Sequence, residues 1–248
     1  MASRQSRSLN SARVILLSGL GDPAAWWFTL PPPAKAQPHW SGVSGPPQAG
    51  IAIKLGQHTR VIAYDRAGIG QSTPAQHDRI WADVYEELDR VIDTSSLSGP
   101  PVLMGHSLGG LIAYTYARRF PHRVAGLVLL DPTPPPLSPR PVVALPERLA
   151  PSHFEPDEVA PEALGELPLV LIAPGQVPSG HPDSDMGRPQ SALDARYAQR
   201  RAQHEQLLRT TARSHGTWTS GAGHYVHLEH PDEVMAATLT LLKMVKTR

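Results

Sequence analysis

Short apolar runs separated by amphipathic segments are the feature that most constrains the fold of this chain. Runs of this kind, bounded by glycine, proline and aspartate, are typical of strands buried on both faces of a parallel sheet. The clear runs are residues 14–17, 61–64, 102–104, 124–130 and 167–173, with a weaker one at 217–219. We therefore expect an α/β fold: a doubly wound, mostly parallel sheet of about six strands flanked by helices.

Helical periodicity fills the intervals between these runs. Apolar residues at three- and four-residue steps predict an amphipathic helix over 78–94. Residues 108–120 form a second helix, which Pro121 ends. A long charged helix is expected over 192–212, and a last one begins at Pro231.

Two proline-rich segments, residues 23–56 and 132–168, interrupt this alternation. They are much longer than ordinary connections of about 4–6 residues, so we interpret them as insertions at strand ends, with partly disordered linkers as the alternative. A length of 248 residues suits a single domain spanning 1–248. The short stretch before the first run places that strand, at 14–17, at an edge of the sheet.

Composition excludes several classes of function. A net charge of +1 argues against nucleic acid as a partner, because phosphate binding needs a basic excess. The absence of cysteine removes disulfides, thiolate nucleophiles and cysteine-ligated zinc. No stretch approaches the roughly 20 apolar residues of a membrane span, and no signal-peptide core follows the N-terminus. We expect a cytoplasmic protein without membrane contact, and the sequence leaves its oligomeric state open.

The strongest local signal is the run Gly105-His106-Ser107-Leu108-Gly109-Gly110, between a predicted strand and a predicted helix. This G-x-S-x-G pattern puts the serine on a sharp turn that only small neighbours allow. Its hydroxyl would project into a cleft, and the Leu108 amide at the helix N-terminus would point to the same place as one donor of an oxyanion hole. The alternative is a glycine-rich helix start without chemistry.

With this motif the chain resembles the α/β-hydrolase fold family, in its serine hydrolase branch. Residues 18–22 (Ser-Gly-Leu-Gly-Asp) resemble the family's oxyanion loop, with Ser18 where that loop usually has histidine. The resemblance implies a second oxyanion donor at the backbone amide of Leu20. Residues 64–72 resemble the D-R-x-G-x-G-x-S turn of the family, which we interpret as structural, with local hydrogen bonds from Asp65 and Ser72.

The resemblance also covers residues 221–231, which match the G-H-x-x-x-x-E-x-P segment before the last helix and imply that His224 is the catalytic base. His224, His227 and His230 are evenly spaced, which would suit a metal ion. Gly223 and Pro231 argue against one continuous helix there, so we expect neither metal nor cofactor and interpret His227 as a packed or capping residue.

The acid of the expected triad is less obvious. In many family members it lies in a G-x-x-D turn after the penultimate strand, but here that position is Pro178, and the next carboxylates are Asp183 and Asp185. Some relatives carry the acid one strand earlier, where this chain has Asp131. We favour Asp131, with Asp183 or Asp185 as alternatives and a strand-end turn as its structural role otherwise. The order Ser107, Asp131, His224 is the one that the fold requires.

These residues predict a carboxylesterase-like serine hydrolase that cleaves a small ester, thioester or lactone through an acyl-enzyme. One alternative is the same scaffold used for acyl transfer to another acceptor, cofactor-free perhydrolysis or lyase chemistry. A second is a non-catalytic binding protein that keeps the fold. Trp26 and Trp27 follow the oxyanion loop and are candidates for a substrate-binding wall, with core packing as the other interpretation. The segment 132–168 occupies the place where relatives carry a lid.

Overall fold

The computed structural model describes residues 13–30, 48–95, 99–135, 164–175 and 189–246. Its centre is a parallel six-stranded sheet with the order β4-β1-β5-β6-β7-β8. The prediction of a mostly parallel α/β sheet of about six strands is confirmed. In spatial order the strands are β4 (Arg60–Ala63), β1 (Arg13–Leu17), β5 (Val102–His106), β6 (Gly126–Leu130), β7 (Leu169–Pro174) and β8 (Ser214–Thr219).

The expected edge position of the first strand is wrong. β1 pairs with β4 on one side and β5 on the other, so that Val14 lies opposite both Val61 and Val102. The physical reason is burial: Val14 to Leu17 are fully buried and carry no charge that would protect an exposed edge. β4 takes the edge instead, and it begins at the exposed Arg60.

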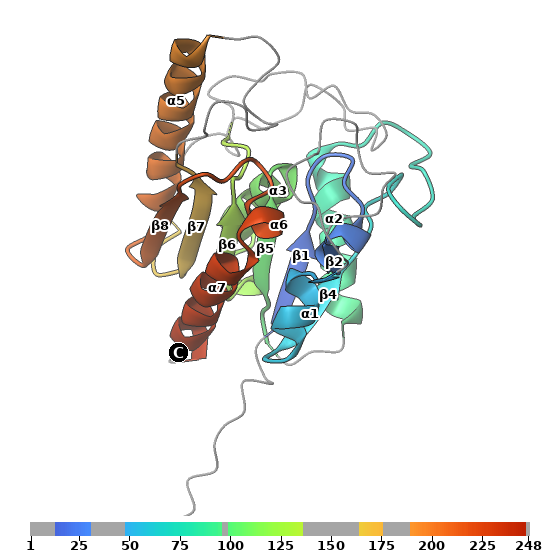
Figure 1. Cartoon of the computed structure of the whole chain (residues 1–248). Helices are drawn as coiled ribbons and strands as arrows, with labels where there is room; N and C mark the ends of the chain where they lie inside the picture. The colour runs from blue at the N-terminus through green and yellow to red at the C-terminus, as the bar shows by residue number, and fades with distance from the viewer. Residues whose placement is uncertain (1–12, 31–47, 96–98, 136–163, 176–188, 247–248) are drawn as a thin grey trace, which may run out of the picture.

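Helices cover both faces of the sheet (Figure 1). Alternate residues of each strand point to opposite faces, so Val14 and Leu16 belong to one hydrophobic core and Ile15 and Leu17 to the other. The first core is closed by α1 (Ile51–Gly56) and α7 (Pro231–Lys246). The second is closed by α2 (Trp81–Thr94), α3 (Leu108–Arg119) and α5 (Gln190–Leu208).

The segment 23–56 is not a simple insertion, since both of its described ends belong to the packed structure. Residues 24–30 form the 3-10 helix η2 (Ala24–Trp27) and strand β2 (Thr29–Leu30), which pairs with β3 (Gln48–Ala49). Ile51 and Leu55 of α1 are buried in the core. Six residues are too few to show helical periodicity, which explains why α1 was not predicted.

Most of the second proline-rich segment, the candidate lid, lies outside the described residues. Two short helical pieces complete the described structure, η3 (Pro121–Arg123) and α6 (Val226–Glu229). None of the described helices is long and apolar enough to cross a membrane.

The turn between β5 and α3 depends on close contact between backbones. A Cβ atom at Gly109 would lie 2.1 Å from the Leu17 carbonyl oxygen of β1, and one at Gly105 would lie 2.2 Å from the Gly109 carbonyl oxygen. The turn brings Ser107 to φ 52° and ψ −116°, outside the regions that non-glycine residues favour. Such a conformation costs on the order of 1–3 kcal/mol and persists only where the surrounding packing enforces it.

We predict that Gly109→Ala destabilises the protein by at least about 2 kcal/mol, because its methyl group has no space against the β1 backbone. Gly56→Ala is the matched control. Gly56 is an exposed helical residue, and a Cβ atom there would meet no other atom within 4 Å, so the same change should be neutral or slightly stabilising. Urea unfolding of both variants measures the difference. Equal stability of the two would contradict the close-packing account of the turn.

Candidate active site

Ser107 lies at the N-terminus of α3, held on both sides by backbone hydrogen bonds. Its amide donates to the Leu130 carbonyl at 3.1 Å, and its carbonyl accepts from Gly110, Leu111 and Thr133 at 3.0, 3.2 and 2.9 Å. Since the carbonyl of a trans peptide points opposite to the next amide, these bonds turn the Leu108 N–H away from the helix body, toward its N-terminal end. That end carries positive partial charge and favours an anion.

Arg66 fixes the direction of the loop that carries Leu20. Its guanidinium is buried and donates to the carbonyls of Ser18 and Gly19, each at 2.6 Å. With the Gly19 carbonyl turned toward Arg66, the Leu20 amide in the same peptide plane points the opposite way. The Leu20 side chain is 37% exposed and takes no part in this arrangement.

The D-R-x-G-x-G-x-S turn supports the same loop. Asp65 Oδ1 accepts from the Ala24 amide at 2.7 Å, Asp65 Oδ2 accepts from the Gln71 amide at 3.0 Å, and Ser72 Oγ donates to the Asp65 carbonyl at 2.6 Å. The turn therefore has the structural role that its glycines and polar residues predict.

Trp26 and Trp27 are both buried beside this loop. Trp27 donates from Nε1 to Ser18 Oγ at 2.8 Å, and its ring lies 4.5 Å from that of His227. Trp26 packs against Tyr225, with 5.7 Å between ring centroids. Trp27 thus supports the loop through the residue that replaces the usual histidine, while direct contact of either indole with substrate remains a prediction.

His224 lies in the loop between β8 and α6 and contacts two parts of the sheet. Its Nδ1 is 2.5 Å from Asp131 Oδ2. Its carbonyl accepts a hydrogen bond from His106 Nε2 at 2.9 Å, and the two imidazole rings are 4.6 Å apart. Because His106 directly precedes Ser107, this contact brings the His224 loop to the turn that carries the serine.

Asp131 terminates β6 with an unusual backbone. Its φ is 38°, and among the described residues only Ser107 and Asp131 combine a side chain with a positive φ. Backbone strain tends to gather at functional sites. The Asp131 amide donates to Ile172 of β7 at 2.7 Å, so the sheet holds the residue in place.

The Asp131 carboxylate is buried, yet nitrogen atoms of Arg200, His204 and His224 lie close to it. Arg200 Nε donates to Oδ1 at 2.8 Å, and His204 Nε2 lies 3.8 Å from the same oxygen. Burial by itself would raise the pKa of Asp131, but the charge of Arg200, the hydrogen bond and charge of His224 and the charge of His204 together lower it below its usual range. The carboxyl is therefore ionised at neutral pH and accepts the Nδ1–H of His224.

The other acid candidates, Asp183 and Asp185, lie outside the described residues, as does Pro178. Within the described part of the chain, the carboxylate that contacts His224 Nδ1 is that of Asp131, the residue that the sequence analysis favoured as the acid.

His106 and His227 form a buried layer behind His224. Their rings are 4.6 Å apart, and Trp27 contacts the far member, His227. Burial lowers the pKa of both histidines, and the charge that His224 can carry lowers each further. His227 Nδ1 is buried without a hydrogen-bond partner, which fits a packed residue.

Sequence reasoning missed three residues that hold this site together: Arg66, His106 and Arg200. Arg66 lies in a motif that was recognised, but its bonds to the oxyanion loop span 47 and 48 positions of the chain. Arg200 is one of several arginines in a charged helix, 69 residues from Asp131. No local pattern distinguishes such residues from solvent-exposed ones.

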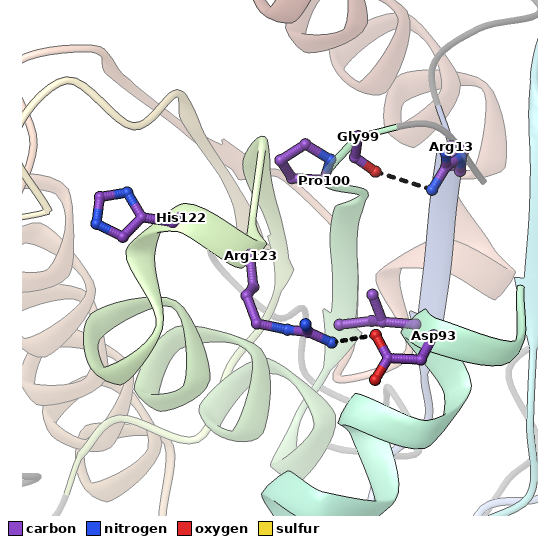
Figure 2. Close-up of a pocket in the computed structure, with 7 residues that line it drawn as sticks. Arg13, Asp93, Gly99, Pro100, His122 and Arg123 are labelled. Carbon is purple, nitrogen blue, oxygen red and sulfur yellow. Dashed lines mark hydrogen bonds and ion pairs between the residues drawn. The ribbon is translucent and has the colours of Figure 1, made fainter. Parts of the chain in front are cut away.

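A separate cavity of about 310 Å³ lies at the amino ends of β1 and β5 (Figure 2), whereas Ser107 follows the carboxyl end of β5. Arg13 NH1 donates to the Gly99 carbonyl at 2.8 Å, and Arg123 NH2 donates to Asp93 at 2.6 Å. These bonds connect the end of α2 to η3, and Gly99 to β1. The cavity is lined by Arg13, Ile92, Asp93, Gly99, Pro100, His122 and Arg123.

Comparison with known proteins identifies the family. A family model described as alpha/beta hydrolase fold matches residues 12–159. This chain therefore belongs to the α/β-hydrolase fold family, as the resemblance of its motifs implied.

Curated relatives match only parts of the chain. The protein named "Putative carbamate hydrolase RutD" from Variovorax paradoxus is 36% identical over 120 residues, which cover 48% of this chain and 37% of the relative. The (lyso)-N-acylphosphatidylethanolamine lipase of Bos taurus is 37% identical over 79 residues, 31% of this chain and 23% of the lipase. The matches thus span well under half the length of these relatives.

Solved structures share the fold over nearly the whole chain. A thermophilic esterase from Thermogutta terrifontis has a TM-score of 0.65 at 22% identity, covering 96% of this chain and 92% of the esterase. The monoacylglycerol lipase of Paleococcus ferrophilus has a TM-score of 0.60 at 17% identity, covering 94% and 96%. At these identities the neighbours show the shared fold, in agreement with the family match.

Buried histidines should make the protein sensitive to mild acid. The folded-state pKa values of His106, His204 and His227 are lowered, mainly by burial, while an unfolded histidine titrates near about 6.5. As the pH falls through about 6.5, the unfolded chain binds protons first, so the free energy of unfolding decreases. Each such histidine contributes a slope of up to about 1.4 kcal/mol per pH unit.

We predict that His227→Phe, which keeps the ring contact with Trp27, loses less stability than the parent between pH 7 and pH 5. Denaturant unfolding at several pH values measures the slopes. His122→Gln, which removes an exposed imidazole instead, is the matched control. Parallel stability curves for His227→Phe and the parent would show that His227 does not titrate with unfolding.

Proposed function

We propose that this protein is a serine hydrolase that cleaves a small ester, thioester or lactone through a Ser107–His224–Asp131 triad. The observation that carries the proposal is the 2.5 Å contact between His224 Nδ1 and Asp131 Oδ2, in a loop that rests on the residue before Ser107. A carboxylate that accepts from Nδ1 leaves the lone pair of a neutral imidazole on Nε2, the atom that a general base uses.

In the proposed reaction, Ser107 Oγ attacks the carbonyl carbon of the substrate while His224 Nε2 takes the hydroxyl proton. Collapse of the tetrahedral intermediate transfers that proton to the leaving alcohol or thiol and leaves an acyl group on Ser107. Water, deprotonated by His224, then attacks the acyl group; collapse of this second intermediate breaks the bond to Ser107 Oγ, returns the proton from His224 to that oxygen and releases the acid. Asp131 holds the imidazole orientation and stabilises the imidazolium in both halves of the reaction.

Two amides are the proposed donors to the oxyanion. Leu108 supplies one at the start of α3, and Leu20 supplies the other from the loop that Arg66 holds by its carbonyls. Removal of one such donor costs about 3–4 kcal/mol of transition-state stabilisation in known cases. The replacement of the usual histidine by Ser18 does not affect this role, because both donors are backbone groups.

An ester substrate is favoured by the neighbouring structures, which include an esterase and a monoacylglycerol lipase. A carbamate is the second candidate, since a relative that matches 48% of this chain is named for carbamate hydrolysis. Both bonds present a carbonyl to the same nucleophile, so a panel of nitrophenyl esters and carbamates with different chain lengths separates them. Competing alcohol, amine and peroxide acceptors in the same assay distinguish hydrolysis from acyl transfer.

We predict that a fluorophosphonate labels Ser107 in the folded protein and that Ser107→Ala abolishes the label. Against the best ester of the panel, Ser107→Ala and His224→Ala should each lower kcat by about 10³–10⁶-fold, because the nucleophile and base act as a unit. Asp131→Asn should lower kcat by about 10⁴-fold, since the asparagine amide favours the wrong imidazole tautomer.

Peptide mapping by mass spectrometry locates the label, and circular dichroism establishes that each variant is folded. Asp194→Asn, on the exposed part of α5, is the matched control for the acid and should keep full activity. A folded parent protein that neither takes the label at Ser107 nor turns over any substrate would reject the proposal in favour of a binding protein with the same fold.

A further inference from the structure

Helix α5 contributes an arginine to the carboxylate that His224 contacts. Arg200 Nε donates to Asp131 Oδ1 at 2.8 Å, and Arg200 NH2 donates to the Asp131 backbone carbonyl at 3.0 Å. The Arg200 guanidinium therefore binds both the side chain and the backbone of Asp131. Asp131 Oδ1 accepts a hydrogen bond from Arg200, and Asp131 Oδ2 lies next to His224 Nδ1.

This pairing changes the electrostatics of the site. In a Ser-His-Asp triad the carboxylate attracts a proton onto the imidazole. Here Arg200 stays charged over the whole pH range of activity and neutralises much of that attraction. The pair is well protected from water on one side, since the Asp131 side chain is 3% exposed and that of Arg200 is 24% exposed.

The other titratable groups around Asp131 and His224 come from α5, β5, α6 and the loop that carries Asp22, and Tyr225 contacts the His224 ring with 5.4 Å between ring centroids. His204, one turn after Arg200 on α5, is buried and donates from Nε2 to the Pro132 carbonyl at 3.0 Å. His106 of β5 and His227 of α6 pack behind His224, and Asp22 of the oxyanion loop lies 3.6 Å from His106 Nδ1. Burial lowers the pKa of His106, His204 and His227, so these rings are neutral near pH 7 and leave Arg200 as the permanent cation beside Asp131.

We propose that Arg200 is a positioning residue that sets the lower pH limit of activity, by orienting the Asp131 carboxylate and by weakening its hold on a proton at His224. The inference rests on the proposed function, because it assigns His224 the role of base. Without the guanidinium, the unneutralised carboxylate stabilises the imidazolium more strongly. His224 then stays protonated, and inactive as a base, up to a higher pH.

The test compares pH profiles of kcat/KM for the parent, Arg200→Gln and Arg200→Lys. In Arg200→Gln the acid limb should move to higher pH by about 0.5–1 unit, the size expected for one charge a few ångströms away in a partly solvated site. Arg200→Lys keeps the charge but loses the pair of hydrogen bonds to the Asp131 carboxylate and carbonyl. The acid limb of its pH profile should therefore move by less than about 0.3 unit, while kcat falls several-fold.

Arg196→Gln is the matched control, because it removes an exposed guanidinium one turn earlier on the same helix. Its profile should coincide with that of the parent. A merely structural role for Arg200 would lower kcat or the melting temperature in both Arg200 variants without moving the limb, and that result would overturn the proposal. If Arg200→Gln does not fold, a limb in Arg200→Lys displaced by about 0.5 unit or more would overturn it equally.

A second measurement does not depend on turnover. Titration of the imidazole nitrogens by NMR, with His224 assigned through His224→Gln, should show His224 binding its proton at higher pH in Arg200→Gln than in the parent by the same interval. If this shift is present while the parent hydrolyses nothing, the effect of Arg200 on proton binding at His224 holds, and the proposed function fails together with the role in activity. If the parent is active and neither the NMR titration nor the acid limb moves, the proposed function stands and the inference fails.

Discussion

The close approach of three backbones is the constraint on which the rest of the structure depends. Gly109 lets the first turn of α3 touch the carbonyl of Leu17 in β1, and Gly105 lets the same helix turn touch the end of β5. This contact, together with the backbone hydrogen bonds of Ser107, keeps the residue in its strained conformation. The strain is small beside the free energy gained by burying β1, β5 and α3 in the core, so the sheet can hold the turn without losing stability.

Two arginines then fix the polar groups on either side of this turn. Arg66 binds the carbonyls of Ser18 and Gly19, which determines where the next amide points. Arg200 binds the carboxylate and the carbonyl of Asp131. Arg66 and Arg200 lie on different parts of the fold, and each is distant in sequence from the residues that it binds. The site is therefore assembled by long-range hydrogen bonds on a rigid sheet, and not by any one loop.

Sequence reasoning reached those parts of the molecule that local patterns encode. The apolar runs and their alternation with helices predicted the parallel sheet, and the resemblance to relatives that carry the acid one strand earlier directed attention to Asp131 at the end of β6. Pairing between strands is not encoded locally, so β1 was expected at an edge although it lies inside the sheet. Helix α1 was not predicted because six residues are too few to show helical periodicity, and its burial depends on contacts with α7 and β4.

The polar support of the site was beyond local reasoning for a similar reason. His106 was recognised only as the variable residue of the serine motif, yet it joins the His224 loop to β5. Arg200 is preceded by Arg196 and followed by Arg201 on the same helix, and only the three-dimensional fold selects it as the partner of Asp131. The role of a charged residue in such a helix depends on which residue the sheet places opposite it.

Arg66 donates hydrogen bonds to the two carbonyls before Leu20, so the direction of the Leu20 amide does not depend on the Leu20 side chain. The direction of the Leu20 amide is set by the preceding peptide, while its partly exposed side chain is left unconstrained. Position 20 is therefore a place where the side chain can be replaced without redirecting the backbone amide. The hydrogen-bond donor itself would be carried through such changes intact.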